Sequence, residues 1–145
     1  MEFLNLVNMA NAAVKSNKIQ EAIKLFDNAL KLNPTSFEVC SKLGLLSFQA
    51  GDLDNSINYF KKTLLLDPKS SLGYSNLGLI YSKLNNQDLA LENYLKAYEI
   101  DPKNFIVNYN LANHFFSNND GKNAEKYYQL SIELNPRHFY PYNNL

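Results

Sequence analysis

The sequence contains one cysteine and two histidines among 145 residues, so it has few of the side chains that most often carry chemistry. The single thiol, Cys40, has no partner for a disulfide within the chain, and no Cys/His cluster has the spacing of a metal site. Neither His114 nor His138 has a serine, cysteine or carboxylate at the spacing of a catalytic triad. We therefore expect no metal, no cofactor and no enzymatic activity, and packing or solvent-exposed roles for both histidines.

Net charge and long apolar runs are also lacking. Fourteen basic residues balance fourteen acidic ones, which argues against a nucleic-acid-binding protein or a membrane-surface protein, since both normally carry a basic excess. No apolar run approaches the roughly 18 residues of a transmembrane helix, so we expect no membrane insertion. The first residues lack the basic and apolar segments of a signal peptide. From this we expect an intracellular, cytoplasmic protein.

What the sequence does contain is a repeat of 34 residues. Four of its five prolines recur at that interval, and each follows an Asn or Asp; they are Pro34, Pro68, Pro102 and Pro136. With the proline as position 32, the repeats span residues 3–36, 37–70, 71–104 and 105–138, and a fragment, 139–145, follows. A fixed period of this length is typical of solenoid proteins.

Each repeat predicts two amphipathic helices, because apolar or small residues recur at helical spacing in both halves. Position 15, between the halves, holds residues that readily adopt the left-handed conformation that ends a helix: Asn17, Gly51, Asn85 and Asn119. Position 34 holds good N-cap residues for the next first helix, Ser36, Ser70 and Asn104. Position 8 is always small, which lets the two helices approach closely: Ala10, Gly44, Gly78 and Ala112.

These features resemble the tetratricopeptide repeat (TPR), whose signature is W-x2-L-G-x2-Y, then A-x3-F, then P. The third repeat matches best, with YSNLGLIY at 74–81 followed by Ala90, Tyr94, Ala97 and Pro102. The second repeat departs from the signature at Cys40, which we expect to be a small buried core residue. The resemblance implies an all-α, right-handed α-solenoid in a single domain, with four TPR units and a partial fifth first helix. It also implies a protein-binding scaffold.

In the TPR family the first helices line a concave groove that binds an extended peptide. Carried over position by position, the resemblance gives the candidate peptide-binding residues Asn8, Asn11, Lys42, Leu45, Phe48, Asn76, Leu79, Lys83, Tyr109, Asn110, Asn113 and Phe116. Apolar groups alternate with amides in this set, and its cations outnumber the nearby Glu38. We expect the partner to be a protein or peptide whose bound segment is extended and partly apolar, with an acidic group near Lys42 or Lys83.

Position 6 carries asparagine in most repeats. Its residues are Asn8, Lys42, Asn76, Asn110 and, in the fragment, Asn144. This row is similar to the asparagine row in the TPR region of O-linked N-acetylglucosamine transferase, where a primary amide can pair with a peptide backbone through its donor and acceptor. Asparagine makes up 22 of 145 residues, so composition alone supplies part of the pattern. The alternative TPR ligand, a chaperone C-terminal carboxylate, is disfavoured because its cations are missing in both possible registers.

Two other functions stay open. Stacked repeats need a polar end cap, and the fragment Phe139, Tyr140, Tyr142 and Leu145 would cover the fourth repeat only partly. We therefore expect that the parent protein continues beyond residue 145, or that the open C-terminal end packs on another copy to form a homo-oligomer. The third possibility is a substrate-selecting TPR arm of a larger glycosyltransferase-like enzyme.

Overall fold

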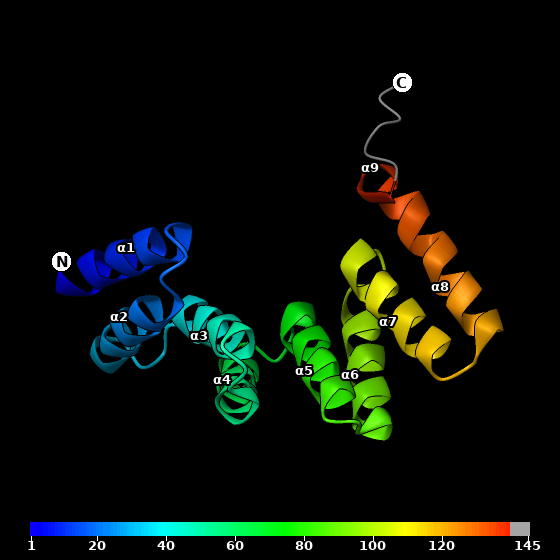
Figure 1. Ribbon diagram of the computed structural model, residues 1–145, viewed down its shortest axis with the longest axis horizontal. Coiled ribbons are helices and arrows are strands. Elements are labelled where there is room, and N and C mark those ends of the chain that lie inside the picture. Colours follow the sequence, from blue (N-terminus) through cyan, green and yellow to red (C-terminus); the bar gives the residue numbers. More distant parts are fainter. Residues whose placement is uncertain (140–145) are drawn as a thin grey trace. The chain divides into compact units, whose positions relative to one another are not determined.

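The computed structural model describes residues 1–139, and over that range the chain is entirely helical, without a β-strand (Figure 1). The helices are α1 (Glu2–Lys15), α2 (Ile19–Leu32), α3 (Phe37–Gln49), α4 (Leu53–Leu66), α5 (Ser71–Lys83), α6 (Gln87–Ile100), α7 (Phe105–Ser117), α8 (Gly121–Leu134) and α9 (Pro136–Phe139). The first eight form consecutive pairs, α1 with α2 through α7 with α8. The predicted all-α repeat of helix pairs is confirmed.

The turns within and between the pairs form as the sequence predicts. At position 15 the backbone is left-handed in every repeat, with φ of 57°, 79°, 59° and 63° at Asn17, Gly51, Asn85 and Asn119. The side chains of Ser36, Ser70 and Asn104 cap the first helices α3, α5 and α7 by accepting backbone N–H bonds. Each second helix up to α8 ends two residues before the repeated proline, at Leu32, Leu66, Ile100 and Leu134.

The chain divides into two compact units, Met1–Pro68 and the part that begins at Lys69. The first unit contains α1–α4, and the second contains α5–α9. Within the first unit α2 packs against α3, and within the second α6 packs against α7. Each unit thus holds two helix pairs and one junction between them.

Close approach of paired helices depends on the small residue at position 8. In α3 and α5 it is a glycine, and a Cβ built on Gly44 would lie 2.8 Å from the Phe60 ring, while one on Gly78 would lie 2.7 Å from the Tyr94 ring. Both rings are buried, at 1% and 3% exposure. The Ser56 hydroxyl donates a 2.7 Å hydrogen bond to the Gly44 carbonyl across the same contact. The large residue at position 24 therefore fills the space that the missing side chain leaves.

The start of the fifth repeat differs from the prediction. We expected the partial fifth first helix in the fragment 139–145, but α9 already begins at Pro136 and includes His138. The reason is local capping: His138 replaces the Ser or Asn that caps the other first helices, and its own N–H donates to the Asn135 side chain at 3.3 Å. Proline favours the first position of a helix, so α9 starts directly after Asn135. Residues 140–145 of the expected fifth helix, with Asn144, lie outside the described residues.

Candidate functional site

The twelve candidate peptide-binding residues lie on the first helices of the four pairs. In the first unit α1 carries Asn8 and Asn11, and α3 carries Lys42, Leu45 and Phe48. In the second unit α5 and α7 carry the remainder, Asn76, Leu79, Lys83, Tyr109, Asn110, Asn113 and Phe116. None of the twelve is buried, and the largest apolar exposures among them are 46% at Leu45 and 67% at Phe116. Each is therefore accessible to a ligand on its own unit.

In the first unit an open hollow of about 200 Å³ lies among α1, α2 and α3. The predicted residues Asn11, Lys42 and Leu45 line it together. The other lining residues are Val14, Phe26, Leu46 and Gln49. These four were not among the twelve candidates, and Phe26 and Leu46 occupy core positions that are closed from solvent, at 0% and 4% exposure.

Lys42, which interrupts the asparagine row, has three contacts at the hollow. Its ammonium donates to Asn11 Oδ1 at 2.7 Å and lies 3.1 Å from Glu38 Oε1. The same nitrogen lies 5.6 Å from the centroid of the Phe26 ring, within the range of a cation–π contact. Three neighbours, on α1, on α2 and on its own helix α3, therefore fix one cation at the rim of an apolar hollow.

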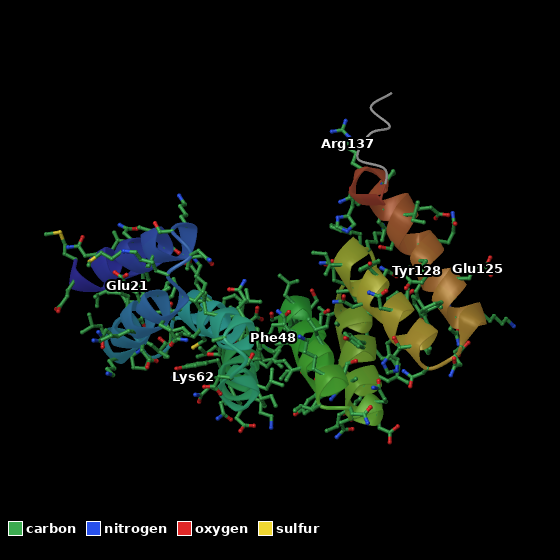
Figure 2. The ribbon with its side chains drawn as sticks, in the orientation of Figure 1. Glu21, Phe48, Lys62, Glu125, Tyr128 and Arg137 are labelled. Carbon is green, nitrogen blue, oxygen red and sulfur yellow. The ribbon has the colours of Figure 1, made fainter. Side chains whose placement is uncertain are left out.

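The second unit holds its groove amides in a different network. Asn110 Nδ2 donates to Ser75 Oγ at 2.9 Å, which links α7 to α5. Tyr128, labelled on α8 in Figure 2, donates its hydroxyl to Asn113 Oδ1 at 2.5 Å. Asn76 has no side-chain hydrogen bond to any residue in the range 1–139. Tyr128 was not among the predicted site residues, since its repeat position is normally buried and signals only packing.

The residues of the position-6 row do not bond to one another within either unit. Lys42 reaches back to Asn11, which is at position 9 of the preceding repeat, and Asn110 reaches back to Ser75, at position 5. Lys42 and Asn110 of the row are thus bonded to side chains at other repeat positions. The donor and the acceptor of the Asn76 amide are both available to other partners.

Comparison with known proteins agrees with the repeat. Family models described as "Tetratricopeptide repeat" match residues 7–71, 71–104 and 106–138. The chain belongs to the tetratricopeptide repeat family. No curated protein sequence matches this TPR chain.

Solved structures of TPR-like shape align over most of the chain. The crystal structure of MamA has 20% identity and a TM-score of 0.82, and the alignment covers 94% of this chain and 80% of the MamA chain. MamA 41-end from Desulfovibrio magneticus RS-1 has 23% identity and a TM-score of 0.80, with 90% and 74% coverage. TTC0263, a thermophilic TPR protein of Thermus thermophilus, has 18% identity and a TM-score of 0.82, with 92% and 75% coverage. At these identities the likeness concerns the fold.

The remaining candidates for chemistry are part of the TPR core. Cys40 is 0% exposed, and burial raises the pKa of its thiol, which keeps it protonated and unreactive. The prediction of a small buried core residue is confirmed. Among residues 1–139 no group of His, Cys, Asp and Glu has an arrangement that could hold a metal ion. Within the same range no helix is long and apolar enough to cross a membrane.

At the N-terminal end the packing face of the first TPR is open. Met9 occupies the repeat position of Leu43 and Leu111, which are fully buried, yet Met9 is 56% exposed. No helix of the described chain covers it.

In the second unit a hollow of about 370 Å³ lies along α7 and α8, and its lining includes Phe116, Ala124 and Tyr128.

His114 is buried in the α6–α7 junction of the second unit, at 6% exposure. Its ring centroid lies 5.7 Å from those of Tyr94 and Phe115, and no described residue bonds to its buried Nδ1. Burial lowers the pKa of His114 from its usual 6.5, because removal from water disfavours the charged imidazolium. The predicted packing role is confirmed.

This burial makes stability depend on pH. Because the unfolded chain binds the proton more readily than the folded one, we expect the free energy of unfolding to fall as pH drops below about 6.5. His114→Ile should flatten the loss between about pH 7.5 and pH 5, since apolar residues occupy this repeat position in the second and third repeats, as Leu46 and Ile80. Denaturant titrations across that range measure the effect. An unchanged slope in His114→Ile would contradict the assignment.

Proposed function

We propose that this chain is a scaffold that binds an extended segment of a protein partner along the first helices of its repeats. The observation that carries the proposal is the hollow of the first unit, where Asn11, Lys42 and Leu45, all placed on the groove from the sequence, meet around an apolar floor. Concave sites with mostly apolar walls and a few polar groups are typical of ligand binding. Membership of the TPR family supports a protein partner.

The second unit contributes amides in place of an apolar hollow. Asn76 has both its donor and its acceptor available among the described residues, and Asn110 uses only a donor, toward Ser75. A primary amide can satisfy the N–H or C=O of a peptide backbone whatever the side chains are. The asparagines thus supply affinity with little sequence selectivity, and the hollow of the first unit supplies the selectivity.

We expect the double variant Asn76→Ala/Asn110→Ala to weaken binding by about tenfold, since each lost hydrogen bond contributes roughly 0.5–1.5 kcal/mol. The probe is a peptide selected from a displayed library of random 12-residue sequences, since about 12 extended residues span the groove of two helix pairs. Fluorescence anisotropy measures the Kd of this peptide. The matched control is Asn5→Ala/Asn58→Ala, which removes two exposed asparagines outside the groove positions.

The control should bind the selected peptide as the wild type does. A groove variant with wild-type affinity would show that the asparagine row does not contact the peptide. Failure of the library to yield any enriched sequence would count against peptide binding itself.

A further inference from the structure

The rim of the first-unit hollow carries two groups whose hydrogen-bonding roles are fixed by chemistry. A lysine ammonium has donors and no acceptor, so the atom of Asn11 that faces Lys42 Nζ at 2.7 Å must be the carbonyl oxygen. The Asn11 Nδ2 group is consequently the part of the amide left for a ligand. Both rim groups, one on α1 and one on α3, offer donors.

The cation is also held in place before any ligand arrives. Lys42 contacts Asn11, Glu38 and the face of Phe26, and its side chain is 33% exposed. Fixing a flexible lysine in advance reduces the entropy that binding would otherwise cost. Asn11 and Glu38 occupy two of the three ammonium donors, so one donor is left for a ligand.

Below the rim the surface is apolar. Val14 and Leu45, which are 39% and 46% exposed, form walls above Phe26 and Leu46. A side chain bound in the hollow would remove part of this apolar surface from water. A hollow of about 200 Å³ with such walls suits an aliphatic side chain.

We propose that this hollow binds an aliphatic residue of the partner, and that Lys42 and Asn11 together bind the carboxylate of the acidic residue beside it. The inference rests on the proposed peptide-binding function and names the partner's sequence class. A carboxylate fits better than a backbone amide because Lys42 supplies a positive charge and Asn11 a second donor on an adjacent group.

Glu38 is the internal competitor for this site. Its carboxylate lies 3.1 Å from Lys42 Nζ, but its side chain is 67% exposed, so water screens the pair and the pairing is weak. The partner's carboxylate gains a second donor from Asn11 that Glu38 does not use. Removing Glu38 should therefore tighten binding, whereas removing either rim donor should weaken it.

The test uses three peptides blocked at both ends, so that no terminal charge contributes: acetyl-Ala-Leu-Asp-Ala-amide, its Leu-Asn analogue and its Ala-Asp analogue. They are titrated into the isotope-labelled 145-residue chain, and NMR shifts of the Asn11 side-chain amide and of the Leu45 and Leu46 signals give Kd. We expect the Leu-Asp peptide to bind at least about fivefold more tightly than either analogue, since each lacks one of the two contacts.

Variants assign the preference to the rim. Lys42→Met keeps the stem over Phe26 but removes the charge, so it should abolish the preference for Asp over Asn. Asn11→Ala removes the second donor and should weaken binding of the Leu-Asp peptide, and Glu38→Gln should increase the preference for Asp. Far-UV circular dichroism checks that each variant is folded. Equal binding of the three peptides, no binding of any, or an Asp preference that survives Lys42→Met overturns the inference. The library-selected peptide tests groove binding independently, because the proposed function stands if that peptide binds without regard to Lys42.

Discussion

Phe60→Ala is expected to lower the free energy of unfolding by about 3–5 kcal/mol, a large part of the total stability of an ordinary domain. The Phe60 ring is 1% exposed and lies directly against Gly44 on the paired helix. Because Gly44 has no side chain, nothing on that side of α3 can move in to fill the cavity. The free energy of unfolding therefore falls for two reasons, the loss of buried apolar area and the cavity that the ring leaves.

Equilibrium denaturation followed by far-UV circular dichroism measures this effect. The control is Leu65→Ala on the same helix, where the side chain is 83% exposed and we expect a change within about 0.5 kcal/mol. A cost below about 1 kcal/mol for Phe60→Ala would mean that the α3–α4 contact repacks freely, contrary to the close approach at Gly44.

Gly78→Val should destabilise the chain by about 2–3 kcal/mol, the upper part of the range for overpacked cores. A Cβ at this position would lie 2.7 Å from two atoms of the Tyr94 ring, and that ring is 3% exposed, so it has little room to move. Burial also raises the pKa of Tyr94 to about 12, in accord with a neutral phenol inside the core. The added methyl groups must therefore displace an aromatic ring or separate α5 from α6.

Another glycine of the same unit gives the control. Gly121, the first residue of α8, would have no heavy atom within 4 Å of an added Cβ, so Gly121→Ala should be neutral or stabilising by up to about 1 kcal/mol. Gly78→Ala should fall between the two, since Ala10 and Ala112 hold the equivalent position in other repeats. If Tyr94→Leu fails to recover part of the Gly78→Val loss, the clash is with some other group.

Most of the fold could be predicted from the sequence because its signals are local and repeated. A left-handed residue, a capping side chain and a proline each affect the backbone only within a few residues. Asn85, Ser70 and Pro68 therefore predict the nearby helix ends without knowledge of the tertiary structure. The prediction was wrong where the repeat itself changes. At His138 the capping residue is missing, and Asn135 starts α9 early.

Part of the candidate site could also be predicted. The resemblance to the TPR placed Asn11, Lys42 and Leu45 on the groove, and all three line the hollow. The resemblance did not point to Tyr128, which bonds to Asn113, because the sequence of a repeat does not show whether a packed phenol also reaches a neighbouring amide. The peptide-binding roles of the twelve residues stay predictions, to be tested by the selected peptide.

The sequence by itself determined the helix pairs, their ends and the residues that share a face, since these depend on backbone preferences and on the 3.6-residue turn. The tertiary structure decided which side chains across neighbouring helices meet. Lys42 bonds to Asn11 at 2.7 Å because of the spacing between α1 and α3. As a result, the residue that interrupts the asparagine row forms a pair of donors with Asn11 above the apolar floor of the hollow. The spacing between helices depends on the packing of the core side chains beneath them. This packing depends on many residues together and cannot be read from any single position of the sequence.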